Sequence, residues 1–248
     1  LMNSVKIFDI PFTTFKKKDL IEEILKRVNK NEKTYIVTAN AEIAMYAKQN
    51  KGYENIIKKA NYIVPDGIGV VKGAKILNQY IPERIPGIEL MVDLLEKAND
   101  NGYSVYFYGA REEVLNMMIK NLQVKFPKLN IIGYNHGYDN DDNNKITNDI
   151  INLKPDYIFV AKGYPAQDLW IDKVINKVDK GCFIGVGGSF DVLGGFIKRA
   201  PEMWIKLNLE WLYRIAGDPK RWKRSIALPK FIIEVLKEKA SIKRKDTK

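Results

Sequence analysis

Short apolar runs alternate along most of the chain with longer segments whose apolar positions recur at helical spacing. Runs rich in β-branched and aromatic residues predict strands, while recurrence at every third or fourth position predicts amphipathic helices. Strands are predicted at residues 5–10, 34–38, 62–64, 103–109, 156–161 and 182–186, with a further strand and loop in 130–138. Helices are predicted at residues 18–30, 40–48, 52–60, 68–77, 87–99, 111–125, 145–153 and 165–178. This alternation predicts an α/β fold, with a Rossmann-like, mostly parallel sheet flanked by helices.

The pattern changes at Arg199-Ala200-Pro201, where we place a domain boundary. Residues 1–199 are expected to form the α/β domain and residues 200–248 a C-terminal amphipathic helical appendage. One helical stripe of the appendage holds Trp204, Leu207, Trp211 and Ile215. A second helix, at 226–240, has an apolar face made of Leu228, Ile232, Val235 and Leu236. Apolar faces of this width are typical of core packing, but also of helices that lie on a lipid surface.

Charge separates the two parts of the chain. The net charge is +11, and residues 198–248 hold 15 Lys and Arg against 6 Asp and Glu, whereas the preceding residues hold 26 against 24. A nearly neutral body with a basic tail indicates contact with nucleic acid or with an anionic membrane. Two tryptophans beside cationic residues and a lysine-rich end favour the membrane.

The rare residue types exclude several kinds of site. A single cysteine, Cys182, excludes an internal disulfide and fits a reducing compartment. A single histidine, His136, argues against histidine-based zinc sites and against Ser-His-Asp chemistry. The acidic run at 139–144 lacks the glycine and glutamate of a calcium loop, so we expect no metal site. With no signal peptide and no apolar run near the ~20 residues of a membrane span, the chain is expected to be cytoplasmic.

Polar and small residues follow five of the predicted strands. In open α/β sheets, ligands bind beyond the carboxyl ends of the strands, so these exits are the candidate site. They hold Thr38 and Asn40, then Asp66, Gly109 to Arg111, Gly163 to Gln167, and Gly185 to Asp191. Five such exits are more than an inert scaffold requires.

Each polar exit residue also has a purely structural interpretation. Asp66 is either a turn or cap aspartate, or a general base that takes a proton. Thr38 and Asn40 are either helix caps or hydrogen-bonding partners of a polyhydroxylated ligand. Arg84 lies between two prolines, where it is either a solvated charge or a cation held in a site by a stiff loop.

The turn of Gly185, Val186, Gly187 and Gly188 allows a phosphate to approach main-chain N–H groups. It lacks the third glycine of a dinucleotide fingerprint, and no P-loop motif is present in the chain. In the basic tail, Arg214, Arg221 and Arg224 have a spacing that lets two or three of them converge on one anion.

Together these segments resemble the WecG/TagA/CpsF family of bacterial glycosyltransferases across essentially the whole chain. The stretches that carry the resemblance are TANAEI (38–43), PDGIGVV (65–71), RIPGIEL (84–90), YFYGA (106–110), GYPAQDLWI (163–171), GVGGSFDVLGG (185–195), KRAPEMWIKLNLEWLYRI (198–215) and DPKRWKR (218–224). They are long and occur in order, so the resemblance is specific.

The resemblance implies transfer of N-acetylmannosamine from a UDP donor to undecaprenyl-diphosphate-linked N-acetylglucosamine, as in wall teichoic acid linkage-unit synthesis. It further implies an inverting reaction that needs no bound metal or cofactor. Relatives that transfer N-acetylmannosaminuronic acid share these motifs, so that donor is the alternative. The implied location is the inner face of the cell membrane, with peripheral attachment.

Roles follow from the resemblance as hypotheses. Asp66 is the general base, while Thr38, Asn40, Arg84 and Gln167 orient the sugar and the acceptor. Gly109, Gly163, Gly185, Val186, Gly187 and Gly188 hold the nucleotide, and Asp191 accepts from the uracil N–H. The appendage is then a lid that brings Arg214, Arg221 and Arg224 over the diphosphates.

Two other classes of function are weighed against this one. A nucleotide-cofactor oxidoreductase would need an intact glycine fingerprint and an acidic ribose partner, which the chain lacks. A nucleic-acid-binding protein would account for the basic tail but not for the polar strand exits, so no nucleic-acid partner is expected. The apolar tail fits either lipid or a second copy of the chain, which leaves a homo-oligomer off the membrane open.

Overall fold

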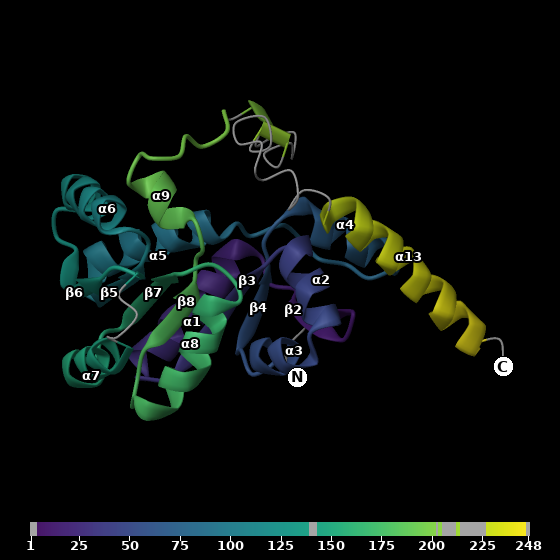
Figure 1. Cartoon of the computed structure of the whole chain (residues 1–248), viewed down its shortest axis with the longest axis horizontal. Coiled ribbons are helices and arrows are strands. Elements are labelled where there is room, and N and C mark those ends of the chain that lie inside the picture. The colour runs from purple at the N-terminus through teal and green to yellow at the C-terminus, as the bar shows by residue number, and fades with distance from the viewer. Residues whose placement is uncertain (1–3, 139–142, 202, 205–211, 214–226, 247–248) are drawn as a thin grey trace.

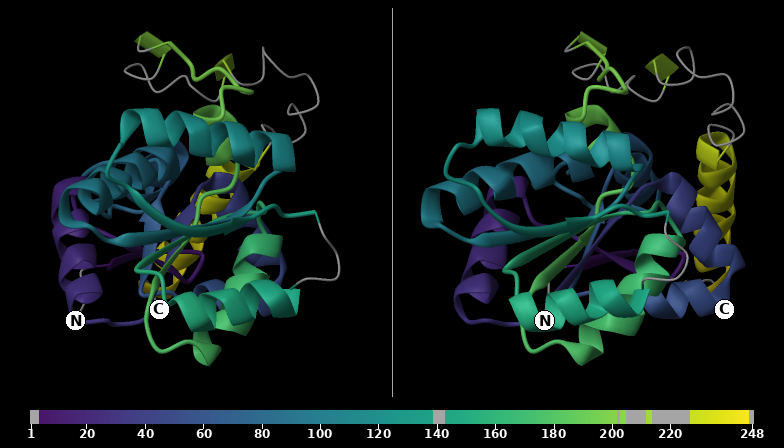
Figure 2. Two further views of the ribbon diagram at one scale, coloured as in Figure 1. Left: turned by 90° about the vertical axis from the view of Figure 1, so that its left-hand side faces the viewer. Right: turned by 60° about the vertical axis from the view of Figure 1, so that its left-hand side comes forward.

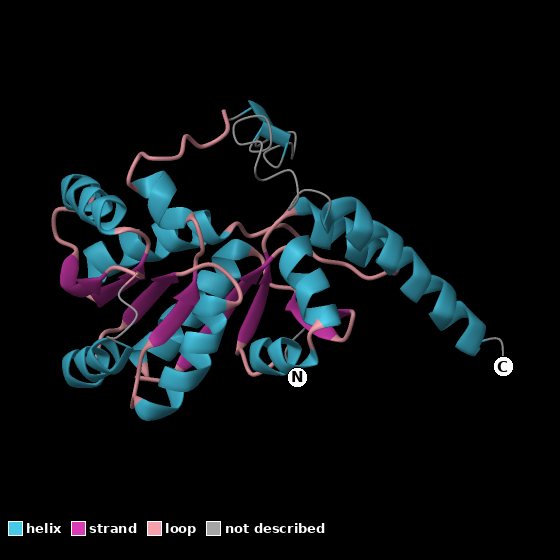
Figure 3. Ribbon diagram, viewed as in Figure 1, coloured by secondary structure: helices cyan, strands magenta, loops and turns pink. Residues whose placement is uncertain are grey.

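The computed structural model describes residues 4–138, 143–201, 203–204, 212–213 and 227–246. Its strands, magenta in Figure 3, lie between the helices. They form one eight-stranded sheet in the order β1-β2-β4-β3-β8-β7-β5-β6. The strands are β1 Ser4–Ile7, β2 Ile10–Thr13, β3 Thr34–Ala39, β4 Tyr62–Pro65, β5 Ser104–Gly109, β6 Asn130–Asn135, β7 Tyr157–Ala161 and β8 Cys182–Gly185. Every pairing is parallel except that of β1 with β2, so the expected α/β fold with a mostly parallel sheet is confirmed.

Helices cover both faces of the sheet (Figures 1 and 2). One face packs against α2 Ala41–Gln49, α3 Lys51–Ile57, α4 Ile68–Ile76, α7 Asn143–Leu153, α8 Ala166–Val174 and α13 Ala227–Asp246. The other face packs against α1 Lys17–Asn29, α5 Gly87–Asn101, α6 Glu112–Lys125 and the short α9 Ser189–Leu193. A single 3-10 turn, Ile175–Lys177, follows α8.

Both faces of the central strands are buried, which accounts for their continuous apolar runs. In β7, Ile158 and Val160 contribute to one apolar core while Tyr157 and Phe159 contribute to the other. Cys182 at the start of β8 is buried in the second core, as expected for a structural thiol. Each fully buried apolar side chain stabilises the fold by about 1.5–3 kcal/mol.

The first strand predicted from the sequence is in part wrong. Residues 5–10 were expected to form one strand, but the chain reverses at Phe8 and Asp9 and pairs Ile7 with Ile10. Phe8 and Asp9 have φ of 54° and 64°, which is the backbone of a two-residue type I′ turn. Such turns normally carry Asn-Gly or Asp-Gly, so Phe-Asp gives no recognisable hairpin signal.

The connections after β3 and β8 leave the sheet on opposite faces, although these two strands are neighbours. After β3 the chain enters α2 on one face, and after β8 it enters α9 on the other. Open α/β sheets bind ligands at such a switch point, because the diverging connections leave the carboxyl ends of the strands accessible. The topology therefore selects the β3–β8 edge from among the five polar exits.

Helix α13 confirms a helix in the last part of the chain and packs against α2 and α4 (Figure 1). Phe231 and Val235 are fully buried, and Phe231 lies so close to Gly73 of α4 that an added Cβ there would be 2.7 Å from its ring. Of the predicted apolar face, Leu228 and Ile232 also pack on the core, but Leu236 is 51% exposed. In the predicted stripe before it, only Trp204 belongs to the described residues, and its ring contacts that of Tyr213.

None of the helices formed by the described residues combines the length and the apolar character needed to span a bilayer.

Replacing Phe231 with alanine should destabilise the fold by about 3 kcal/mol, because it empties a fully buried ring site between α13 and the body. Urea-induced unfolding monitored by circular dichroism measures this loss. Ile233→Ala is the matched control, since Ile233 lies on the same helix but is 53% exposed and should change stability by less than about 0.5 kcal/mol. Equal effects of the two substitutions would contradict the observed packing of α13.

Candidate functional site

Main-chain hydrogen bonds continue beyond the ends of the parallel strands and join one exit to the next. Asp66 N donates to Ala39 O at 3.0 Å, and Val186 N donates to Val160 O at 2.9 Å. On the far side of β7, Ala110 N donates to Ala161 O at 3.0 Å. These bonds join the exit of β4 to that of β3, and the exits of β8 and β5 to that of β7.

Thr38 and Asn40 lie at the end of β3, at the switch point of the sheet. The hydroxyl of Thr38 donates to Gly185 O at 2.8 Å and is buried. Gly87, the first residue of α5, packs so closely on Thr38 that an added Cβ would be 2.9 Å from its hydroxyl oxygen. Asn40 is the N-cap of α2, and its side-chain oxygen accepts from Ile43 N at 3.0 Å. The cap interpretation is confirmed for Asn40, whereas Thr38 joins two strands.

Asp66 and Arg84 are brought to the same corner by the backbone. The hydrogen bond from Asp66 N fixes the aspartate beside the end of β3, and Gly67 next to it lies against Asn40. Gly67, not Asp66, is the N-cap residue of α4. Ile85 N donates to Pro65 O at 2.9 Å, which brings the preceding residue, Arg84, near Asp66. Both Asp66 and Arg84 are partly exposed, as groups that meet a ligand must be.

Gln167 holds the glycine turn that follows β8. Its side-chain oxygen accepts from Gly187 N at 3.1 Å, and the side chain is only 2% exposed. An added Cβ on Gly185 would be 2.5 Å from the amide nitrogen of Gln167, so a larger residue cannot replace this glycine without displacing the amide. Together with the bond from Val186 N, this contact occupies two N–H groups of the turn within the protein.

The described residues leave open space in front of two exit glycines. An added Cβ on Gly163 or Gly187 would meet no described atom within 4 Å. Both have positive φ, 69° and 50°, and both lie beside Gln167, since Gln167 N donates to Gly163 O. An added Cβ on Gly188 would be no closer than 3.8 Å to a described atom, a carboxylate oxygen of Asp191. Gly187 and Gly188 thus leave room for a ligand beside the backbone, although the N–H of Gly187 is already bonded to Gln167.

Gly109 serves the packing of the edge. Its φ is 126°, and an added Cβ would be 2.5 Å from the backbone of Ala161 in β7. Only glycine allows β5 and β7 to approach this closely. β7 separates Gly109 from the β3–β8 switch point.

The three predicted tail residues, Arg214, Arg221 and Arg224, lie outside the described residues. The chain on both sides of them is held near the candidate site. On one side, the guanidinium of Arg199 forms an ion pair with Glu89 in the first turn of α5. On the other, Leu228 at the start of α13 packs against Gly69 in the first turn of α4.

Comparison with known proteins identifies the family of the chain. The model of the glycosyl transferase WecG/TagA/CpsF family matches residues 5–245. The chain belongs to this family. Relatives named N-acetylglucosaminyldiphosphoundecaprenol N-acetyl-beta-D-mannosaminyltransferase are similar over nearly their full length. The relative from Bacillus spizizenii is 41% identical and covers 87% of this chain and 84% of its own length.

Two further relatives of the same name extend the comparison. The one from Bacillus subtilis is 36% identical, over 98% of this chain and 94% of its own. The one from Staphylococcus aureus is 39% identical, over 97% and 95%. The matches therefore include the α/β body and α13 alike.

The structure also reveals polar groups that the sequence pattern did not single out. Lys162, directly after β7, donates through Nζ to the hydroxyl of the buried Tyr108 at 2.7 Å. Asp168, next to Gln167 in α8, is fully buried and accepts from Tyr35 at 2.8 Å and from Tyr53 at 2.7 Å. Burial raises the pKa of Asp168 to about 6, although the two tyrosine hydrogen bonds oppose that rise.

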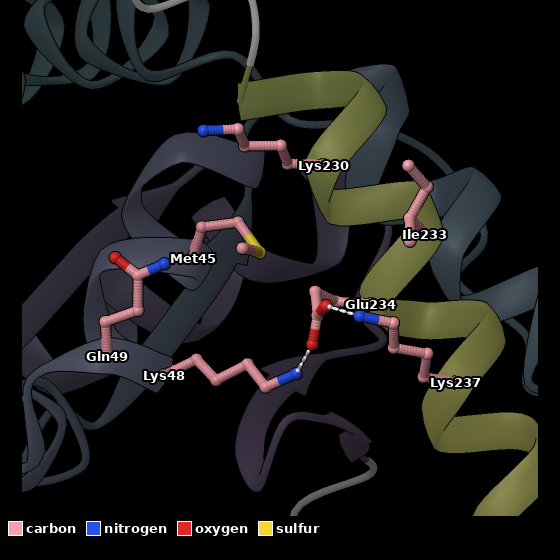
Figure 4. Close-up of a pocket in the computed structure, with 7 residues that line it drawn as sticks. All are labelled: Met45, Lys48, Gln49, Lys230, Ile233, Glu234 and Lys237. Carbon is pink, nitrogen blue, oxygen red and sulfur yellow. Dashed lines mark hydrogen bonds and ion pairs between the residues drawn. The ribbon is translucent and has the colours of Figure 1, made fainter.

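A hollow of about 500 Å³ lies away from this edge, between α2 and α13 (Figure 4). Glu234 lies there between Lys48 and Lys237, whose hydrogen bonds lower its pKa to about 2. Glu234, the only carboxylate among the described residues that line the hollow, is thus paired within the protein, and the polar strand exits do not line the hollow. We therefore place the candidate site at the strand exits. Among the described residues, no group of three His, Cys, Asp or Glu side chains is arranged to hold a metal ion.

Asp168 should make stability depend on pH between about 4 and 6. Its pKa rises from the ordinary value of 3.8 to about 6 on folding, so in this interval the folded chain keeps a proton that the unfolded chain has released. Its contribution to stability then falls as pH rises, by up to about 1.4 kcal/mol per pH unit. Asp168→Asn removes this titration. Urea unfolding of both proteins at pH 4 and at pH 6.5 measures the effect: the stability of the variant minus that of the unmodified chain should be larger at pH 6.5 than at pH 4. The same difference at both pH values would contradict the assignment.

Proposed function

We propose that the protein is an inverting glycosyltransferase. It moves N-acetylmannosamine from UDP-N-acetylmannosamine to undecaprenyl-diphosphate-linked N-acetylglucosamine, which forms the disaccharide linkage unit of wall teichoic acid. The observation that carries this function is the near-full-length similarity to three relatives with one enzyme name, at 36–41% identity. The same relatives favour N-acetylmannosamine over N-acetylmannosaminuronic acid as the transferred sugar.

Asp66 is the general base of the proposed reaction. Its carboxylate takes the proton of the acceptor hydroxyl while the hydroxyl oxygen attacks the anomeric carbon of the donor. The bond from that carbon to UDP breaks on the opposite face, and UDP leaves with the electron pair. Attack opposite the leaving group converts an α-linked donor into a β-linked product. The partly exposed position of Asp66 at the switch point supports this role.

Four further residues orient the reactants in this proposal. Asn40 and Arg84 share the corner that holds Asp66, so one sugar ring can meet these residues, while the buried Thr38 acts by holding the end of β3 against Gly185. Gln167 acts through the turn after β8, because its amide is buried against Gly185 and Gly187. Residues that orient bound reactants can lower the activation free energy by several kcal/mol without taking part in bond making.

The nucleotide is proposed to lie along the exits of β8, β7 and β5, formed by Gly185 to Gly188, Gly163 and Gly109. Support comes from the open space in front of Gly163 and Gly187. Asp191 follows the turn in α9 and is proposed to accept from the uracil N–H. The N-termini of α2, α4, α5 and α8 all face this edge of the sheet, and their dipoles favour the negative charge that develops on UDP.

Arg214, Arg221 and Arg224 are proposed to neutralise the diphosphates from the appendage, residues 200–248. The described residues on either side of them support this role. Arg199 pairs with Glu89 in α5, the helix that follows Arg84, and Leu228 packs on α4, the helix that follows Asp66. With these cations in place the reaction needs no metal or other cofactor. This assignment, like the division into residues 1–199 and 200–248, stays a prediction.

We further propose that the enzyme attaches peripherally to the inner face of the cell membrane, where a polyprenyl-diphosphate acceptor resides. In α13, Ile233 and Leu236 are about half exposed and lie among lysines, as in helices that bind anionic lipid. Away from lipid, the same face is free to support a homo-oligomer.

A direct assay tests the function. UDP release should require both UDP-N-acetylmannosamine and a lipid-diphosphate-N-acetylglucosamine analogue, and it should continue in EDTA. UDP-N-acetylmannosaminuronic acid is the control donor, and a lipid-diphosphate without the sugar is the control acceptor. Release with the uronic acid donor alone would support the alternative family activity, and no release with either donor would refute the proposal.

Asp66→Asn should lower kcat by about 100- to 10,000-fold, because the amide cannot take the acceptor proton. KM for the donor should change little, since the amide keeps the size of the side chain. Asp100→Asn is the matched control: Asp100 is an exposed aspartate near the end of α5, remote from the strand exits, and its loss should leave kcat unchanged. Near-normal turnover by folded Asp66→Asn would remove Asp66 from the mechanism.

A further inference from the structure

Asp168 is a buried carboxylate with no role in the chemistry described above. It lies in the first turn of α8, and its two oxygens accept from two tyrosines that come from different elements. Tyr35 belongs to β3, the strand that ends in the catalytic corner, and Tyr53 belongs to α3. The carboxylate thus joins three elements that are far apart in the sequence.

The neighbour of Asp168 explains why this connection matters. Gln167 uses its side chain to hold Gly187 N and lies against Gly185, so its position sets the shape of the turn after β8. A small rotation of α8 would withdraw this amide from the turn. Because adjacent residues on a helix point in directions about 100° apart, fixing the carboxylate of Asp168 on one side also fixes the amide of Gln167 on the other.

We propose that Asp168 is a positioning residue for donor binding: held by Tyr35 and Tyr53, it fixes the rotation of α8 so that Gln167 keeps the turn from Gly185 to Gly188 in its nucleotide-binding form. This inference rests on the proposed function, since it takes the turn to bind UDP. It assigns to three buried residues an effect on donor affinity, although none of them touches the donor.

Apolar contacts between α8 and β3 would attach the helix without the free-energy penalty of burying a charge, so attachment alone does not account for Asp168. Burial of an ionised group without full compensation is expensive, and well-packed apolar residues often replace buried polar groups without loss of stability. What hydrogen bonds add is direction, because two donors from separate elements define where the carboxylate lies. A second tie acts in the same way: Tyr164, just before α8, donates to Glu42 of α2 at 2.7 Å.

The test compares removal of the tyrosine hydroxyls with removal of a similar hydroxyl elsewhere. The double variant Tyr35→Phe/Tyr53→Phe keeps both rings but removes the two side-chain donors of the carboxylate. Tyr106→Phe is the control, since Tyr106 is equally buried on the same face of the sheet, but its hydroxyl is near Asp149 of α7. For each variant, the melting temperature, kcat, KM for both substrates and the Kd for UDP are measured.

The double variant should raise KM for the donor and Kd for UDP by about tenfold, the effect expected from losing one well-formed interaction. KM for the acceptor and kcat should change less than threefold, and Tyr106→Phe should change none of these. Asp168→Asn alone should keep the KM for the donor and the Kd for UDP near those of the unmodified enzyme. Its amide oxygen still accepts from one tyrosine, and its amide nitrogen donates to the hydroxyl oxygen of the other. Asp168→Ala should match the double variant.

Two outcomes would overturn the inference while leaving the proposed function intact. In one, the variants of Asp168 and its tyrosines lower the melting temperature but bind UDP as the unmodified enzyme does. In the other, KM rises equally for donor and acceptor. Failure of the unmodified enzyme to bind UDP or to turn over would instead count against the proposed function. If Asp168→Ala does not fold, the tyrosine variants still decide the question.

Discussion

The candidate site depends on the pairing of β3 with β8. These strands lie far apart along the chain, and the hydroxyl of Thr38 joins them at their carboxyl ends across 147 residues of sequence. Because their connections leave on opposite faces, this is where ligand-binding side chains can stand above the sheet. The site is therefore complete only when the last strand is in place, which makes it a property of the whole α/β body.

Much of this arrangement follows from local sequence. Apolar runs buried on both faces identify the parallel strands, and parallel strands bring all their exits to one edge, so Thr38, Asn40, Asp66 and Gly185 could be grouped without coordinates. The β1–β2 hairpin could not be identified, because its turn is made of Phe8 and Asp9 in a conformation that usually requires glycine or asparagine.

The role of side chains within the site could not be deduced in the same way. The partners of Asp168 are 133 and 115 residues away, and Lys162 finds Tyr108 at a distance of 54 residues. The spacing of apolar residues along the sequence does not predict such pairs, since they depend on which strands become neighbours in the sheet. Gln167 was expected to meet substrate, but its amide is engaged with the turn after β8. The sequence thus predicts which edge of the sheet holds the site, but the side chains exposed to a ligand there are known only from the structure.

The packing of α13 bears on how the basic appendage can act. Phe231 and Val235 complete the core over α2 and α4, so the last helix is part of the fold rather than a free tail. The segment between Arg199 and Leu228 is thereby held at both ends, at the first turns of α5 and α4. These two helices follow Arg84 and Asp66 in the chain. The role proposed for the basic residues between these two points, electrostatic stabilisation of a diphosphate without a metal ion, rests on these two attachments.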